Sequence, residues 1–316
     1  MNKPNSNNNW LTNPLHPLGI FLKLSILVVV YVLLKSSPSQ PTWVVILVLF
    51  AALFLVPIGF QQISKRQTMF RMDTDGLVLH MPCVFLLSMS FLLDRGNLAG
   101  IFALPYATWC VETLLRGLKK ARSLVYFATV AIFLGLAIGS LWLLFDRFGI
   151  QPLGFSNWIV ILKSVHFHYA GFMLLTSLVL FLYQKPDDKP IRIVSIAVII
   201  GLLFMGIGVA LTQLGFYPIY ETFSGVWMGI SSIAAGLIFI KNSFLEKKAT
   251  KILWLLAGIC LVLAMILAFI YALRSVICTD ILTIPFMQSI HGILNALGFG
   301  TLMLLGWALK KMDKAV

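Results

Sequence analysis

The chain has 316 residues, of which 59% are hydrophobic and only 11% are charged. Soluble proteins carry about 25% charged residues, so this composition excludes an ordinary water-soluble globular protein. The formal net charge of +13 does not indicate a nucleic-acid partner, because the Lys and Arg residues stand in short segments between apolar runs, where membrane orientation accounts for them.

Apolar runs long enough to cross a bilayer follow one another along the chain after a polar amino-terminal tail. A spanning helix needs roughly 20 mostly apolar residues, so the runs predict an all-α, polytopic transmembrane helical bundle of about ten spans. We assign residues 1–18 to a cytoplasmic tail and residues 19–316 to a single transmembrane domain. The spans are predicted at 19–35, 42–60, 77–93, 97–118, 123–145, 157–183, 191–214, 220–240, 252–274 and 284–309.

Lys and Arg residues are distributed unequally between the two sides that these spans define. With the amino terminus in the cytoplasm, most of the 24 Lys and Arg residues fall in cytoplasmic segments, and only Lys35, Arg95, Arg147 and Arg274 fall in the opposite loops. Because cytoplasmic loops are enriched in Lys and Arg, we expect both termini in the cytoplasm. The same orientation predicts an outer aromatic belt of Trp43, Trp142, Trp158, Tyr217 and Tyr220, and an inner belt of Tyr126, Tyr183, Trp254 and Trp307.

Several polar residues lie toward the predicted cytoplasmic side of the first four spans. Lys23 lies near enough to the end of the first span to extend its ammonium group to the interface. His80, near the start of the third span, is interpreted as interfacial. Glu112 lies well inside the fourth span, and Arg116 follows four residues later, a spacing that favours an internal ion pair. The pair is retained as a secondary candidate for an inner site.

The sixth span contains two histidines, His166 and His168. They lie about 200° apart around a regular helix, so at most one of them faces a given site. The segment His168–Phe172 resembles Asn295–Phe299 in the tenth span, since each places a polar residue three positions before a Gly-Phe pair. We therefore choose His168 for the site, and expect the two glycines to allow the sixth and tenth spans to approach closely. The two halves of the chain show no convincing echo of an inverted repeat.

Polar residues of the eighth and tenth spans complete a predicted site in the outer half of the membrane. Glu221 starts the eighth span, either as a carboxylate favoured by the helix dipole or as a site residue. An intramembrane histidine is also interpretable as an interhelical hydrogen-bonding residue. Because polar groups inside spans usually face a polar interior, we expect one substrate or proton site. Its candidate residues are His168, His291, Asn295, Glu221, His166 and Gln288.

Metal binding is a further hypothesis for the same residues. Histidine suits zinc, copper, iron and nickel, and the candidate ligands are His166, His168, His291 and Glu221. The sequence has no HxxxH or HExxH spacing, and its four cysteines fit no zinc or redox motif. No cofactor is firmly implied.

The segments His166–Phe172 and His291–Phe299 are similar to those of the YndJ-like family of bacterial membrane proteins. The resemblance seen in these two helices extends through most of the chain. It implies a multi-helix protein of a bacterial inner membrane, in a family sometimes labelled as transporters. It brings no catalytic residues with it.

Three classes of function stay open at this stage. We prefer a transporter-like protein with proton coupling, because histidine titrates near neutral pH. The alternative is a membrane-embedded enzyme that acts on a lipid or isoprenoid-like substrate, with His and Glu as acid and base or as metal ligands. The third is a structural or assembly subunit. The expected partners are membrane lipids and an unknown small-molecule or lipid-like substrate.

Overall fold

The computed structural model describes residues 13–34, 42–66, 74–118, 123–274 and 284–310. In this part of the chain every regular element is helical, which confirms the predicted all-α class. Nine of the helices described are long and apolar enough to cross a membrane. The third predicted span forms a helix too, but its apolar part, Val78–Phe91, is shorter than a crossing ordinarily needs.

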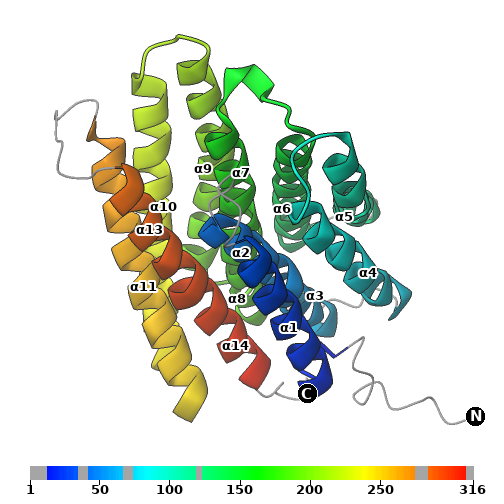
Figure 1. The fold of residues 1–316 in the computed structure, drawn as a ribbon. Helices are drawn as coiled ribbons and strands as arrows, with labels where there is room; N and C mark the ends of the chain where they lie inside the picture. Colours follow the sequence, from blue (N-terminus) through cyan, green and yellow to red (C-terminus); the bar gives the residue numbers. More distant parts are fainter. Residues whose placement is uncertain (1–12, 35–41, 67–73, 119–122, 275–283, 311–316) are drawn as a thin grey trace, which may run out of the picture. The chain divides into compact units, whose positions relative to one another are not determined.

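Contacts along the chain divide it into two compact units, Met1–Met173 and Leu174–Val316. In the first unit α4, α5, α6 and α7 pack on one another in chain order, and α1 and α2 pack together (Figure 1). The elements of this unit are α1 (Pro17–Leu34), α2 (Thr42–Phe50), η2 (Ala51–Leu55), α3 (Val56–Arg66), α4 (Thr74–Phe91), α5 (Asn97–Leu118), α6 (Leu124–Phe148), η4 (Pro152–Gly154), α7 (Asn157–His166) and most of η5 (Phe167–Leu174).

The second unit is also built from helices that pack in chain order. The helix α9 contacts α10, α10 contacts α11, and α11 packs against the whole of the last span. Its elements are α8 (Leu175–Gln184), α9 (Lys189–Gln213), α10 (Ile219–Ser243), α11 (Lys248–Ala272), α13 (Ile284–Ile293), η6 (Leu294–Thr301) and α14 (Leu302–Leu309).

Local sequence signals set several of the helix ends. The Ser123 side chain accepts a hydrogen bond from the Tyr126 amide at the start of α6, and Gly149 ends this helix in the left-handed conformation. The Asp188 side chain accepts from the Ile191 amide at the start of α9. Serine and aspartate are favoured at helix starts because they satisfy amides that have no partner in the helix, and glycine is favoured after the end.

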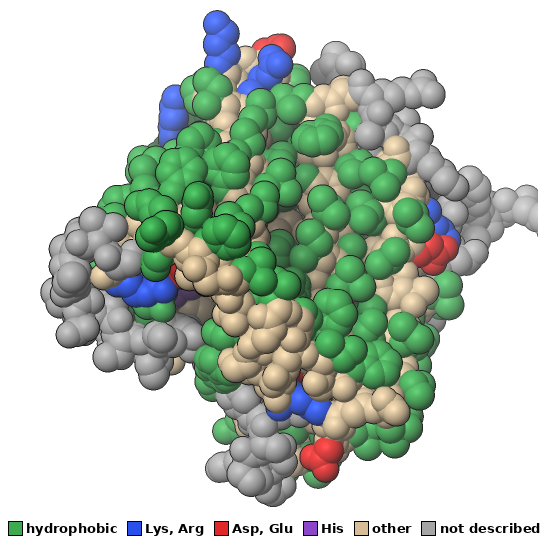
Figure 2. Space-filling model, turned by 90° about the horizontal axis from the view of Figure 1, so that it is seen from above, with side chains coloured by type: hydrophobic (Ala, Val, Ile, Leu, Met, Phe, Trp, Pro, Cys, Tyr) green, Lys and Arg blue, Asp and Glu red, His purple; other side chains and the backbone are tan. Residues whose placement is uncertain are grey.

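Large apolar side chains are exposed along the helices of both units. Phe21 on α1 and Ile193 on α9 are 69% and 65% exposed. Hydrophobic side chains cover most of the face in Figure 2, where Lys, Arg, Asp and Glu form a few separate groups. Exposed apolar patches of this extent mark a surface that contacts a membrane or a partner. Together with the span lengths, they define a multi-pass membrane protein.

Two tryptophans assigned to the inner aromatic belt lie in the core instead. Trp254 and Trp307 are almost completely buried, with ring centroids 4.6 Å apart. The Phe181 ring contacts both of them, at 4.8 and 4.9 Å between centroids. The prediction was wrong because position along a span says nothing about which face of the helix meets other helices. Here α11 and α14 turn their indole rings toward each other.

Candidate functional site

Among the described residues, three of the spans contain a π-helical segment. The segment η2 begins 9 residues after the start of its span (51 − 42), and η5 and η6 each begin 10 residues after theirs (167 − 157 and 294 − 284). In a π-helix each amide bonds to the carbonyl five residues earlier instead of four, so the turn is one residue wider than in an α-helix. Such segments are rare in proteins as a whole, and those that occur are often found at functional sites. They identify the middle of these spans as candidate sites.

The two segments that resemble each other in sequence adopt the same local structure. Each of η5 and η6 has eight residues, with the polar residue second and the glycine fifth. His168 Nδ1 lies 2.8 Å from the carbonyl oxygen of Ser164. Asn295 Nδ2 donates to the carbonyl oxygen of His291 at 2.9 Å. In both spans the polar side chain therefore bonds the carbonyl four residues earlier. The Ser164 carbonyl also accepts from the Phe167 amide.

His168 is fully buried in the first unit. Its Nδ1 must donate, because the Ser164 carbonyl can only accept. Its Nε2 then accepts from the Tyr106 hydroxyl of α5 at 2.9 Å. A Cβ added to Gly139 of α6 would lie 2.8 Å from His168 Nδ1, so this glycine makes room for the imidazole. For a neutral imidazole these hydrogen bonds select the tautomer with its hydrogen on Nδ1.

His291 has the same tautomer in the second unit. Its Nδ1 donates to the Ala264 carbonyl oxygen of α11 at 2.9 Å, and its Nε2 accepts from Asn295 Nδ2 at 3.0 Å. The Asn295 amide nitrogen thus donates one hydrogen to the His291 ring and the other to the His291 carbonyl oxygen. The shared face of His291 and Asn295, predicted from their spacing, is confirmed.

The glycines of the two Gly-Phe pairs allow close helix contact, but with other helices than the sequence argument supposed. A Cβ on Gly171 would lie 3.0 Å from the Gly135 Cα of α6. A Cβ on Gly298 would lie 2.7 Å from the Cys260 Sγ of α11. Each glycine therefore packs against the preceding span of its own unit. That His168 faces His291 and Asn295 stays a prediction, because His168 belongs to the first unit and the other two residues to the second.

The Glu221 carboxylate forms an ion pair with Arg274, which lies at the end of the neighbouring span. It lies in the first turn of α10, and its Oε1 is 2.8 Å from Arg274 NH2. The Arg274 guanidinium lies over the Tyr271 ring, 3.9 Å from its centroid. A carboxylate in the first turn is also favoured by the helix dipole. These contacts favour the structural interpretation of Glu221 over the functional one.

The other candidate residues lie in different surroundings. His166 is half-buried at the end of α7, where its ring packs edge-on to that of Phe167. Gln288 belongs to α13, and its side chain lies outside the described residues. Within the described part of the chain, no group of three His, Cys, Asp or Glu side chains is placed to hold a metal ion.

Glu112 and Arg116 form the predicted ion pair, but on the surface of the helix and not in the interior. Arg116 NH2 lies 2.6 Å from Glu112 Oε1, with the side chains 55% and 53% exposed. Glu112 precedes the end of α5 by 6 residues (118 − 112), about 9 Å at 1.5 Å per residue. Long side chains at such a depth reach the membrane interface. The pair does not face an interior site.

Lys23 and His80 are buried, contrary to the interfacial positions expected for them. Lys23 is 4% exposed and His80 is 1% exposed. The Lys23 ammonium lies over the Phe54 ring, and the His80 ring packs against Trp109. The expectation was wrong because nearness to a helix end does not determine whether the side chain faces neighbouring helices.

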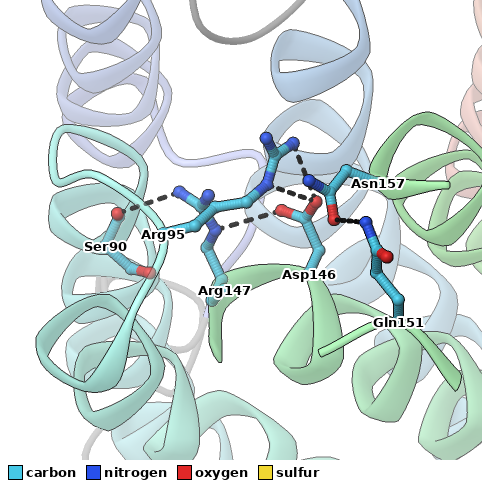
Figure 3. A network of polar contacts seen from close by, with 6 residues as sticks. All are labelled: Ser90, Arg95, Asp146, Arg147, Gln151 and Asn157. Atoms are coloured by element: carbon cyan, nitrogen blue, oxygen red, sulfur yellow. Dashed lines mark hydrogen bonds and ion pairs between the residues drawn. The ribbon is translucent and has the colours of Figure 1, made fainter. Parts of the chain in front are cut away.

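A buried charge network at one end of the first unit had no counterpart in the sequence argument (Figure 3). Asp146 and Arg147, at the end of α6, have fully buried side chains. Asp146 accepts from Arg95 Nε at 3.0 Å and from Arg147 Nε at 3.1 Å. Arg147 NH1 also donates to the Ser90 carbonyl oxygen. Arg95 is 51 residues from Asp146 along the chain, so no local spacing rule connects them.

These features define the class of the protein as a polytopic helical membrane protein with hydrogen-bonded polar side chains at π-helical segments. The family described as YndJ-like protein matches residues 46–299, which is most of the chain. The chain therefore belongs to the YndJ-like family. Searches of the curated proteins and of the solved structures found no match.

Proposed function

We propose that this chain is a transporter-like membrane protein whose substrate or proton site uses the π-helical segments of the sixth and tenth predicted spans. The observation that carries the proposal is that η5 and η6 place a polar residue at the same position, each bonded to the carbonyl four residues earlier. Transporter binding sites are commonly formed where transmembrane helices are interrupted, because polar backbone groups become available there.

The two histidines would serve as the proton-binding groups of this site. Each has its Nδ1 hydrogen on a backbone carbonyl and an Nε2 that accepts a hydrogen bond. Protonation of Nε2 adds a second donor to the ring, so the Tyr106 hydroxyl or the Asn295 amide has to reorient. A proton taken up by either ring is thereby linked to a change in its neighbour, which is the coupling that a proton-driven transporter needs.

The proposal is tested by comparing small molecules in cells and medium, by mass spectrometry, with and without expression of the full chain. We expect a solute whose distribution between cells and medium changes with the wild type and with His166→Ala. We expect no such change with His168→Ala or His291→Ala variants that insert at normal levels. A new lipid or isoprenoid species, with no redistributed solute, would instead establish the membrane-enzyme alternative.

The cellular location is part of the same proposal. We place the chain in a bacterial inner membrane, with both termini in the cytoplasm, on the Lys and Arg distribution of its loops. Membrane lipids are then its constant partners, and the transported molecule is a small or lipid-like substrate.

A further inference from the structure

Lys23 is a buried cation with few partners. A lysine ammonium has three hydrogens to donate. Its hydrogen bond to the Pro14 carbonyl oxygen is long, at 3.5 Å, and its nitrogen lies 5.6 Å from the Phe54 ring centroid. None of the ion pairs among the described residues includes Lys23. Because burying an unpaired charge is very unfavourable, this position calls for a negative group.

His80 provides a second polar group without a partner in the same unit. Its Nε2 is buried and has no hydrogen-bond partner among the described residues. Its ring is held between Trp109, at 4.6 Å between centroids, and Tyr106, at 6.3 Å. The helix α1, which carries Lys23, contacts α4, which carries His80. Buried polar groups are nearly always hydrogen-bonded, so a missing partner indicates a ligand position.

The surroundings favour an anion over a cation or a metal ion. Lys23 and His80 each lie 6 residues after the start of a helix (23 − 17 and 80 − 74). The Gln62 amide nitrogen, a hydrogen-bond donor 4 residues before the end of α3 (66 − 62), is also buried without a partner among the described residues. As successive spans alternate in direction, all three positions belong to the same end of the unit. A lysine beside the imidazole repels metal ions and attracts oxyanions.

We propose that Lys23 and His80 form a binding site for a phosphate oxyanion, supplied by a lipid headgroup or by a soluble phosphate. The ammonium group binds the phosphate as a point charge, and the imidazole donates one hydrogen bond to it. The rings of Phe54 and Trp109 border these two groups and limit access of water, which strengthens the attraction. Lys23 and His80 are not among the residues of the proposed transport site, although Tyr106 contacts both His80 and His168. The proposal stands whether or not transport is found.

The test measures the thermal-unfolding midpoint of the full chain in nanodiscs with inorganic phosphate or with phosphatidic acid. A ligand that binds only the folded state raises this midpoint. We expect a rise with the wild type, and at least a roughly tenfold weaker phosphate response with Lys23→Met and His80→Phe, equivalent to about 1.4 kcal/mol of binding free energy. Lys23→Met nearly keeps the side-chain volume, and His80→Phe, although somewhat larger than histidine, keeps a ring against Trp109. If Lys23→Met does not fold, His80→Phe decides alone.

The control is Lys163→Met, which removes another intramembrane lysine of the same unit, one that lies over the rings of Trp142 and Phe155. Its phosphate response should match that of the wild type. Response to inorganic phosphate identifies a soluble ligand, and response to phosphatidic acid alone identifies a lipid. The proposal is overturned if neither probe raises the midpoint above that in matched chloride salt and phosphatidylcholine, or if Lys23→Met and His80→Phe both respond as the wild type does.

Discussion

At the scale of single residues, the best-defined feature is the shared tautomer of His168 and His291. Each ring donates from Nδ1 to a backbone carbonyl that can only accept. The Nε2 atoms accept from different donors, a hydroxyl in the first unit and an amide in the second. The sequence echo relates His168 to Asn295, but the ring in the same tautomer as His168 is that of His291.

This assignment predicts the protonation pattern of the two rings. In nitrogen-15 NMR of the full chain labelled at histidine, we expect the signals of His168 and His291 at neutral pH to show a protonated Nδ1 and an unprotonated Nε2. Loss of each signal in the matching His→Ala variant assigns it. In Asn295→Leu we expect the His291 signals to change and those of His168 to stay. An Nε2-protonated form of either ring would contradict the hydrogen-bond assignment.

The charged residues should differ sharply in their contribution to stability. Asp146→Asn removes a fully buried carboxylate from two guanidinium groups, and we expect a loss of about 3–5 kcal/mol in the free energy of unfolding, because the arginines are left unpaired. Glu112→Gln breaks an exposed pair, so its effect should be about 1 kcal/mol or less. Unfolding of both variants in the same detergent measures the difference, and equal losses would contradict the role given to burial.

At the scale of the elements, the π-helical segments recur at every fourth predicted span. They lie in the second, sixth and tenth predicted spans, at nearly the same distance from the start of each. An inverted repeat of five and five spans would relate the first span to the sixth, so this recurrence does not support it. In the predicted topology these three spans run in the same direction. What they share in the structure is the distance of the π-helical segment from the start of the span.

Close packing at the glycines of these elements predicts a second stability difference. A Cβ added to Gly135 would lie 2.5 Å from the Gly171 carbonyl oxygen, so Gly135→Ala forces α6 and η5 apart. We expect a loss of about 1–3 kcal/mol, the usual effect of overpacking. Gly206→Ala on α9 meets no atom within 4 Å and should be neutral or stabilising, since alanine is the better helix former. Thermal unfolding of the two variants compares them, and a stable Gly135→Ala protein would show that the helices separate easily.

At the scale of the whole molecule, the orientation in the membrane is the property to measure. Reporter fusions after Lys120, Lys189, Lys248 and Lys314 should report the cytoplasm, because the Lys and Arg residues concentrate in these segments. Fusions near Ser39, Arg147 and Tyr217 should report the opposite side. The short third predicted span matters most for this test. If it does not cross the membrane, every later fusion will report the side opposite to the one predicted.

The sequence by itself determined the class of the protein and the order of its helices. Long apolar runs have few alternatives to membrane helices, because backbone groups in lipid must bond within their own segment. The spans Asn97–Leu118 and Ile284–Leu309 have the predicted limits, and the other spans begin and end within six residues of theirs, the largest difference being the end of the second span at Arg66 (66 − 60). The sequence also predicted the ion pair of Glu112 and the shared face of His291 and Asn295, because these depend only on the helical period.

Only the tertiary structure decided which side chains are buried and what they contact. Trp254, Lys23 and His80 face neighbouring helices although their positions along the spans suggested an interface. Asp146 meets Arg95 across 51 residues, and no period of one helix can encode such a contact. The π-helical segments were also decided only by the tertiary structure. Whether a backbone amide bonds the fourth or the fifth preceding carbonyl depends on packing and side-chain hydrogen bonds more than on composition. The position of a span depends on the hydrophobicity of that segment alone, whereas a polar site depends on which segments pack against one another.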